Sequence, residues 1–210
     1  MAVDKKVSSV VIRRLPRYYR YLGDLLSAGI VRISSKELSR MMNVTASQIR
    51  QDFNCFGGFG QQGYGYNVEY LYNEISEILG IHKGRNMIIV GTGKLGMSIA
   101  GYGNFKKRGF NIIGLFDHNP DLYGVSVNGI EVMPVTELEK FLDTHSVDIA
   151  VLTMPKESVQ EVLPAIKGKV KGIWNFSHKE IPTEKGLAVE NVHLSDSLMT
   201  LSCKIGRMEK

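Results

Sequence analysis

Cysteine and long apolar runs are both scarce in this chain of 210 residues. The only cysteines, Cys55 and Cys203, lie far apart in the sequence, so neither a disulfide framework nor a zinc cluster is expected. No apolar run approaches the roughly 18 residues that a membrane span needs. No apolar signal-peptide core follows the N-terminal residues. These absences favour a cytoplasmic protein without a bound metal or a membrane partner.

The composition is ordinary for a globular protein, with 43% hydrophobic and 22% charged residues, but the charge is unevenly distributed. Residues 1–60 contain ten Lys and Arg against four Asp and Glu, a net charge of +6, whereas the rest of the chain carries −1. A basic segment on a neutral body suggests binding to nucleic acid or to another acidic surface. A solvated basic surface without a partner is the simpler alternative.

The most informative stretch covers residues 86–119. Residues 87–90 form a short apolar run of the kind that builds a strand buried on both faces. The run leads into the pattern G-x-G-x-x-G, formed by Gly91, Thr92, Gly93, Lys94, Leu95 and Gly96. In this pattern the first glycine permits a tight turn, the second lets the backbone approach a pyrophosphate, and the third lets the next helix pack closely. The amide groups that begin this helix would hold the diphosphate.

A carboxylate follows at the distance that nucleotide binding requires. The next predicted strand, residues 111–116, ends on Asp117, roughly twenty residues after Gly96, where a ribose-binding acid is expected. Strand, glycine turn, helix, strand and acid together predict a dinucleotide site. A glycine-rich turn in some other α/β domain is the alternative.

Alternation of strands and helices continues beyond this site. Strands are predicted at 148–153, 171–176 and 189–194, so residues 86–194 should form a Rossmann domain with a doubly wound parallel sheet. Ligands bind such sheets at the carboxyl ends of the strands, which would bring Gly91, Asp117, Thr153 and Phe176 together. Residues 195–210 predict an amphipathic helix, which either folds back on its own chain or packs against a second copy.

The N-terminal residues 1–80 predict a winged helix-turn-helix, separated from the Rossmann domain by a linker at 81–85. A helix is expected over 8–28, with Pro16 in its first turn and four arginines on its outer side: Arg13, Arg14, Arg17 and Arg20. Residues 34–37 and 45–48 each have the pattern of a capping box. They would begin two short helices joined by a turn at residues 43–44, the arrangement of a helix-turn-helix.

The second of these helices has the composition of a recognition helix. Ala46, Ile49 and Phe53 share one face and should be buried. The outward set, able to reach base edges and phosphates, is Ser47, Gln48, Arg50, Gln51 and Asn54. Residues 56–66 interleave five glycines with aromatics, which suits the hairpin of a wing, and the wing residues expected along the DNA are Gly60, Gln62 and Tyr64.

In their order and spacing, these motifs resemble the Rex family of redox-sensing transcriptional repressors over nearly the whole chain. The resemblance is carried by residues 45–53, 65–68, 90–96, 116–120, 153–155 and 172–176. It implies a homodimer that binds palindromic double-stranded operator DNA through winged-helix domains and exchanges C-terminal helices between subunits. It also implies that NADH and NAD bind in the Rossmann domains, and that NADH releases the repressor from DNA.

The resemblance also implies site residues. Besides the glycine motif, the cofactor site would contain Tyr102 near the nicotinamide, together with Asp117, His118, Thr153, Met154, Pro155, Asn175, Phe176 and Leu194. Arg20, Tyr102 and His193 would couple the cofactor site to the DNA-binding domain. Three positions depart from the usual family pattern: Gln51 replaces a lysine, Gln62 an arginine, and His193 an aspartate.

Three other functions compete with this interpretation. An NAD-dependent oxidoreductase with an accessory helix-turn-helix would need a positioned acid or base. The five histidines have no evident catalytic partner, and about 130 residues after the linker leave no substrate domain, so no enzyme is expected. The same fold could instead bind coenzyme A or another nucleotide. Thiol sensing at Cys55 is the third, although a buried, hydrophobic role for this residue is expected.

Overall fold

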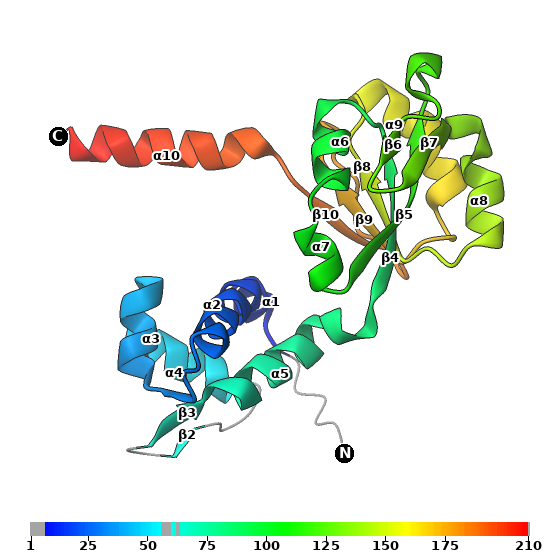
Figure 1. Ribbon diagram of the computed structural model, residues 1–210. Helices are drawn as coiled ribbons and strands as arrows, with labels where there is room; N and C mark the ends of the chain where they lie inside the picture. Colours follow the sequence, from blue (N-terminus) through cyan, green and yellow to red (C-terminus); the bar gives the residue numbers. More distant parts are fainter. Residues whose placement is uncertain (1–6, 56–59, 62–63, 210) are drawn as a thin grey trace. The chain divides into compact units, whose positions relative to one another are not determined.

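The computed structural model describes residues 7–55, 60–61 and 64–209, and the chain divides into two compact units between His82 and Lys83 (Figure 1). The division falls within the segment predicted as a linker. Part of that segment, Ile81–Lys83, is a short 3-10 helix (η1), and strand β4 already begins at Arg85.

The N-terminal unit packs helices against a small antiparallel sheet with the strand order β1-β3-β2. Its elements in chain order are α1 (Ser9–Ile12), α2 (Leu15–Ser27), β1 (Arg32–Ile33), α3 (Ser35–Met42), α4 (Ala46–Asn54), β2 (Gly60–Gln61), β3 (Gly65–Asn67) and α5 (Val68–Leu79). Helices α3 and α4 are the predicted helix-turn-helix, and β2 with β3 is the hairpin beside it. The single helix expected over 8–28 is wrong, because the chain turns at Arg13-Arg14 and starts α2 afresh, with Pro16 in its first turn.

Local hydrogen bonds explain why the helix-turn-helix begins and ends where it does. Ser34 and Glu37 form the predicted capping box, and Asn43 ends α3 in the left-handed conformation with φ 52°. Thr45 Oγ1 accepts from the backbone N–H of Gln48 at 3.1 Å, which caps α4. The second capping box is nevertheless wrong, because the side chain of Gln48 donates to Asp52 instead of returning to Thr45.

The core of this unit is largely apolar but encloses one carboxylate. Buried side chains from every helix meet in it, among them Leu15, Tyr18, Leu22, Leu38, Met42, Ile49, Phe53, Leu71 and Ile75. Asp52 of α4 lies among them with 1% of its surface exposed. Arg14 binds it through Nε at 2.7 Å and Nη2 at 2.6 Å, and Tyr18 Oη and Gln48 Nε2 each donate at 2.8 Å. Arg14 was expected on the outer face; it instead turns inward to neutralise this charge.

These bonds shift the pKa values of the buried groups. Burial raises the pKa of Asp52, but the hydrogen bonds from Arg14, Tyr18 and Gln48 outweigh burial and hold this pKa below its usual value. Burial, and then the hydrogen bond to Asp52, raise the pKa of Tyr18. Asp52 is therefore ionised and Tyr18 protonated at neutral pH.

The C-terminal unit is a seven-stranded sheet with the order β10-β9-β8-β4-β5-β7-β6. Its strands are β4 (Arg85–Val90), β5 (Phe110–Asp117), β6 (Ser126–Val127), β7 (Ile130–Pro134), β8 (Ile149–Leu152), β9 (Gly172–Asn175) and β10 (Ala188–Asn191). Its helices are α6 (Lys94–Ala100), α7 (Asn104–Lys107), α8 (Leu138–Thr144), α9 (Lys156–Ile166) and α10 (Leu194–Met208), with 3-10 turns η2 (Pro120–Leu122) and η3 (Val135–Glu137). All strand pairs are parallel except β6 with β7. Without β6 this is the Rossmann strand order. The order in which strands are added to the sheet reverses between β4 and β8, although these two strands are parallel.

Two details differ from the sequence-based prediction. The hairpin of β6 and β7 was not anticipated, although Asn128-Gly129, with φ of 52° and 81°, is the residue pair that favours such a turn. The last strand ends at Asn191 rather than at 194, and Leu194 begins α10.

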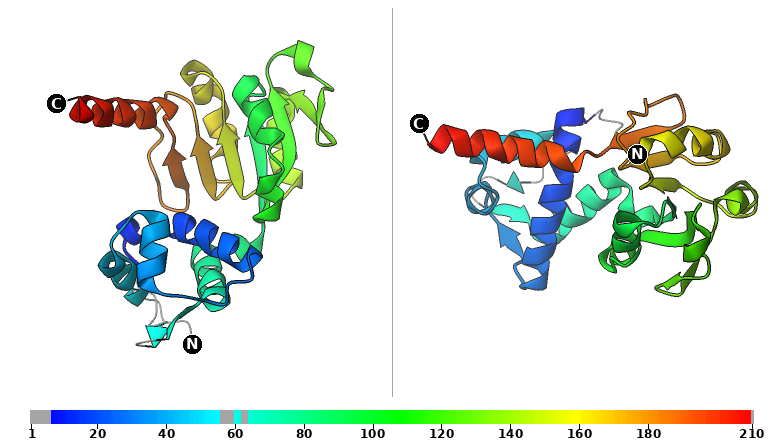
Figure 2. Two further views of the ribbon diagram at one scale, coloured as in Figure 1. Left: turned by 60° about the vertical axis from the view of Figure 1, so that its left-hand side comes forward. Right: turned by 90° about the horizontal axis from the view of Figure 1, so that it is seen from above.

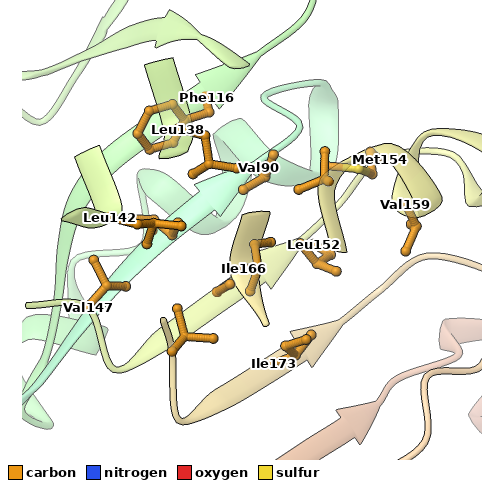
Figure 3. Close-up of a cluster of buried hydrophobic side chains, with 14 of the residues drawn as sticks. Val90, Phe116, Leu138, Leu142, Val147, Leu152, Met154, Val159, Ile166 and Ile173 are labelled. Carbon is orange, nitrogen blue, oxygen red and sulfur yellow. The ribbon is translucent and has the colours of Figure 1, made fainter. Parts of the chain in front are cut away.

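Helices cover both faces of the twisted sheet (Figure 2). On one face α8 and α9 pack on Val90, Phe116 and Leu152, the cluster that Figure 3 shows. On the other face α6 and α7 contribute Ile99 and Phe105 to a second cluster with strand residues. The sheet is thus buried on both sides at its centre, and the carboxyl ends of its strands lie along one edge.

We expect Asp52→Asn to lower the free energy of unfolding of the N-terminal unit by about 3 kcal/mol at pH 7, because Arg14 loses its charged partner. The folded pKa of Asp52 lies below the unfolded value of about 3.9. The stabilisation is therefore complete above about pH 4–5 and is lost as the pH falls through the folded pKa. Urea unfolding at several pH values, with hydrogen exchange of α4 amides, measures both effects.

Asp24→Asn, which changes an exposed acid on α2, is the matched control and should leave stability nearly unchanged. A folded Asp52→Asn protein with parental stability at pH 7 would contradict the structural role of this carboxylate.

Candidate functional sites

The glycine turn connects β4 to α6 at the carboxyl edge of the sheet. Gly91 has φ +96°, and a Cβ there would lie 2.9 Å from the backbone N of Met154. At Gly96 a Cβ would lie only 2.0 Å from the carbonyl oxygen of Gly91. At Gly93 a Cβ would meet no heavy atom of the described chain within 4 Å. Contacts inside the protein therefore demand glycine at 91 and 96 but not at 93.

Asp117 holds this turn in place. Its carboxylate is 5% exposed, and Oδ2 accepts from the backbone N–H and the hydroxyl of Thr92, at 2.5 and 3.0 Å. Oδ1 accepts from the backbone N–H of Asn119 at 2.9 Å, and His118 Nδ1 lies 3.4 Å away. Burial raises the pKa of Asp117, but the bonds from Asn119 and Thr92, and then His118, outweigh burial and keep this pKa below its usual value. Asp117 is therefore a charged acceptor beside the turn.

Four neighbouring strands, β5, β4, β8 and β9, bring predicted site residues together here. The backbone N–H of Gly91 donates to Phe116 O at 2.8 Å, that of Thr153 to Val90 O at 3.0 Å, and that of Phe176 to Leu152 O at 2.8 Å. Thr153 Oγ1 also donates to Gly91 O at 2.5 Å, which ties the end of β8 to the turn. Met154 is buried, and Pro155 begins α9. The four residues expected at one edge, at positions 91, 117, 153 and 176, are therefore neighbours in space.

An aromatic row begins at this edge with Phe176 and continues over the sheet face that α6 and α7 cover. Ring centroids are 4.9 Å apart for Tyr102 and Phe105, 5.8 Å for Phe105 and Trp174, and 4.6 Å for Trp174 and Phe176. Tyr102, at one end of the row, is 49% exposed. The sequence singled out the two ends of the row, Tyr102 and Phe176, and missed Trp174 and Phe105, the latter in a short helix without a periodic signal.

Asn175 was predicted to bind the cofactor, but its side-chain amide forms its hydrogen bonds inside the protein. Its Nδ2 donates to Lys179 O at 2.6 Å and to Asn191 Oδ1 at 2.7 Å. Its Oδ1 accepts from the backbone N–H and the hydroxyl of Ser177, at 3.1 and 2.6 Å. All four hydrogen-bonding positions of the amide are therefore used inside the protein, and the side chain holds the loop after β9.

The remaining predicted residues of this unit are exposed or paired elsewhere. His193 Nε2 lies 2.8 Å from Glu180 Oε1, and its ring stacks on His178 at 6.2 Å between centroids. Glu180, which the sequence did not single out, thus supplies an acid beside His193. Leu194 is 62% exposed at the start of α10, and Lys94 is exposed at the start of α6.

The recognition helix α4 presents most of its predicted DNA contacts outward. Ser47, Arg50 and Gln51 are exposed, whereas Gln48 is half-buried against Asp52. Arg50 Nη1 donates to Ser35 Oγ at 3.2 Å. Cys55, expected to be buried, is exposed, so that expectation is wrong.

The predicted wing is described in part. Gly60 lies in β2 opposite Tyr66, and Gln62 lies outside the described residues. Tyr64 is 70% exposed, and its carbonyl accepts from Arg32 Nη1 at 3.3 Å, an arginine that the sequence did not single out.

Arg20, predicted as a coupling residue, is exposed on α2 with its guanidinium 5.6 Å from the ring centroid of Tyr21.

Within residues 7–55, 60–61 and 64–209 no helix is long and apolar enough to span a bilayer. In the same residues no three His, Cys, Asp or Glu side chains are placed to hold a metal ion.

A winged helix-turn-helix and a Rossmann domain with a glycine turn beside a buried acid together define a DNA-binding regulator with a nucleotide-binding domain. Family models agree with this division: one described as "Putative DNA-binding protein N-terminus" matches residues 6–54, and one described as "CoA binding domain" matches residues 82–179. The chain belongs to the Rex family of redox-sensing transcriptional repressors.

Relatives and solved structures support the assignment to the Rex family. The redox-sensing transcriptional repressor Rex of Caldicellulosiruptor saccharolyticus is 54% identical over 206 residues, which are 98% of this chain and 94% of the relative. The protein of the same description in Clostridioides difficile is 53% identical over 96% of this chain and 97% of its own length. The crystal structure of RSP with beta-NAD+ and operator DNA is 51% identical, with TM-score 0.89 over 97% of this chain and 94% of that one. RSP with beta-NADH is 48% identical, with TM-score 0.88 over 97% and 96%.

Family membership confirms the predicted fold, a winged helix-turn-helix followed by a Rossmann sheet. It also decides against the oxidoreductase alternative, because the family consists of regulators rather than enzymes.

We expect Gly96→Ala to lower the free energy of unfolding of the C-terminal unit by about 1–3 kcal/mol, because the new Cβ would overlap Gly91 O. Gly93→Ala, which adds the same methyl group without such a contact, should change stability by less than about 1 kcal/mol. Unfolding followed by the fluorescence of Trp174, the single tryptophan, measures both variants. Equal stabilities would contradict the close packing of α6 on the turn.

Proposed function

We propose that this chain represses transcription as a homodimer on palindromic operator DNA and leaves the operator when NADH is bound. NAD and NADH would share one site in each Rossmann domain, so that occupancy of the DNA reports the NADH/NAD ratio. The place of action would be the cytoplasm. The solved relatives support this function, because RSP was crystallised with beta-NAD+ and operator DNA and also with beta-NADH.

Gly93 is the observation that carries the cofactor proposal. No contact inside the described chain requires glycine there, whereas the approach of a pyrophosphate to the backbone does. The pyrophosphate would lie over the turn and the first residues of α6, with Lys94 and Leu95 contributing backbone amides, since the backbone N–H of Thr92 already donates to Asp117. Thr92 contributes no side-chain contact in this proposal, because its hydroxyl donates to Asp117.

The ribose would bind at Asp117. A carboxylate has about four lone-pair positions, and the bonds from Thr92 and Asn119 use three of them. The fourth would accept a ribose hydroxyl. The negative charge at this point would also repel the 2′-phosphate of NADPH. The adjoining His118 is 75% exposed in its side chain and would border the adenosine.

The nicotinamide would lie toward Tyr102. The aromatic row of Tyr102, Phe105, Trp174 and Phe176 provides an apolar wall, and residues 153–155 close the site from the end of β8. Asn175 would support this site through the loop after β9, since its amide is already satisfied. Leu194, with His193, would form the border toward α10.

DNA would bind to the N-terminal unit. Helix α4 would enter the major groove with Ser47, Gln48, Arg50 and Gln51, and the hairpin with Gly60, Gln62 and Tyr64 would follow the backbone. The charge distribution supports this, because residues 1–60 carry the net positive charge of the chain.

Helix α10 would join the two subunits. No residue of this helix is buried, and six of its large apolar residues are at least 47% exposed: Leu194, Leu198, Met199, Leu201, Ile205 and Met208. The same unit has an apolar cavity of about 430 Å³ whose lining includes Phe105, Phe110, Ile173, Trp174 and Val189. We propose that a partner's α10 covers such an apolar surface, in a helix exchange between subunits.

Three residues would couple the cofactor site to DNA: Arg20, Tyr102 and His193.

Asp117→Ala should bind NADH about 10- to 150-fold more weakly and lose its preference over NADPH, because it lacks a hydrogen-bonded charge. Fluorescence titration with both cofactors measures this. Thr92→Val is the matched control, since it removes one bond to Asp117 but keeps the carboxylate, and should retain the preference. An unchanged preference in Asp117→Ala would place the ribose elsewhere.

NADH and operator DNA should weaken each other's binding by the same factor, about 5- to 150-fold, because coupling between two sites is reciprocal. NADH affinity is measured with and without a saturating palindromic duplex selected by the protein. A chain ending at Asn191, which lacks α10, should lose dimerisation or coupling.

Equal NADH affinity in both conditions for the full chain would contradict the sensor function. A shortened chain that stays dimeric and fully coupled would leave the sensor intact but remove α10 from its mechanism.

A further inference from the structure

The side chain of Gln48 connects the surface of the recognition helix to the buried carboxylate of Asp52. The two residues are four apart on α4, so their side chains lie on the same side of the helix. Gln48 Nε2 donates to Asp52 Oδ1 at 2.8 Å, and Gln48 is half-buried. One end of this amide is therefore fixed from inside the domain.

Charge determines which end is fixed. An ionised carboxylate only accepts hydrogen bonds, and each oxygen of Asp52 accepts two: Oδ1 from Arg14 Nη2 and Gln48 Nε2, Oδ2 from Arg14 Nε and Tyr18 Oη. Turning the amide of Gln48 by 180° would set Oε1 against Oδ1, two acceptors without a proton between them. The N–H group therefore faces Asp52, and Oε1 faces away from it.

Elements outside the recognition helix hold the carboxylate still. Arg14, directly before α2, donates to both carboxylate oxygens of Asp52. Tyr18 on α2 packs against Phe53, with 5.0 Å between the ring centroids. Asp52 cannot turn to follow the amide without breaking the paired bonds to Arg14. The orientation of Gln48 is thus set by the fold before any DNA is bound.

We propose that Asp52 is a positioning residue for base readout, which fixes Gln48 with its carbonyl outward so that Gln48 selects adenine over guanine. Adenine presents a donor at N6 and an acceptor at N7 in the major groove, whereas guanine presents two acceptors, O6 and N7. The outward Oε1 accepts from adenine N6, and the second amide hydrogen donates to N7. Against guanine the same carbonyl would face O6, acceptor against acceptor. This inference rests on the proposed binding of α4 in the major groove.

The test uses the full-length protein and a library of palindromic DNA duplexes with randomised half-sites. The bound fraction is sequenced, and affinities are measured by competition. We expect the parent to prefer A·T over G·C at one position of each half-site by about 5- to 140-fold. Gln48→Ala should abolish this preference. Asp52→Asn should reduce it at the same position and leave the salt dependence of binding unchanged, because phosphate contacts remain.

Two comparisons separate positioning from general stability. In the Gln48→Ala background, Asp52→Asn should cause no further change in base preference. Arg50→Ala, a neighbouring exposed residue, should weaken binding without removing the preference at the position read by Gln48. If Asp52→Asn does not fold, Arg14→Lys replaces it: this variant keeps the positive charge but loses the paired bonds that hold Asp52, so the adenine preference should fall at the same position.

The outcomes distinguish this inference from the proposed function. A parent protein that binds no duplex of the library overturns DNA binding itself. Selective binding with parental preferences in Gln48→Ala overturns base reading by Gln48. Parental preferences in folded Asp52→Asn, or in Arg14→Lys where Asp52→Asn does not fold, overturn positioning by Asp52.

Discussion

Each unit of this chain contains a carboxylate that lies out of water and accepts hydrogen bonds at both of its oxygens. In the N-terminal unit Asp52 is satisfied by Arg14, Tyr18 and Gln48, which joins α4 to the preceding helices. In the C-terminal unit Asp117 is satisfied by Thr92 and Asn119, which joins β5 to the glycine turn. Because a buried charge without partners is costly, each acid imposes one geometry on the loops and helices around it. Both acids lie directly behind the surfaces that we assign to binding.

Close backbone packing provides the second constraint at the cofactor site. Helix α6 approaches the turn so closely that Gly91 and Gly96 admit no side chain, and Thr153 ties the end of β8 to the same turn. The edge of the sheet at the reversal between β4 and β8 is therefore rigid before a ligand arrives. Binding to a preformed site of this kind loses little free energy to the ordering of loops. Such a site suits a sensor, in which binding free energy must instead distinguish two conformations.

Regulation requires that the two sites in one chain influence each other. The described chain has one element whose apolar surface is unpaired within it, α10, and one apolar cavity in the same unit that is large enough for several side chains. Our proposal assigns both to the dimer. NADH can act on DNA only through its different affinities for the two arrangements of that dimer. The pair of His193 and Glu180 places a charge at the start of α10, where the family pattern has an aspartate.

The sequence by itself determined the kind of protein. Two motifs could be recognised because local geometry alone fixes their spacing. They are the glycines at 91, 93 and 96 after an apolar run, and the pair of Ser34 and Glu37 before a short helix. The strand order β10-β9-β8-β4-β5-β7-β6 also follows the expected Rossmann pattern, apart from the hairpin of β6 and β7.

Only the tertiary structure decided which polar groups remain available for binding. Asn175 was read as a ligand, yet its amide is used by Ser177 and Lys179 in the loop after β9 and by Asn191 at the end of β10. Arg14 was placed on the surface, yet it neutralises Asp52, 38 positions later. Helical spacing cannot reveal the pair of Arg14 and Asp52, because the two residues are distant in sequence and the free energy that selects their pairing arises only when both charges leave water together.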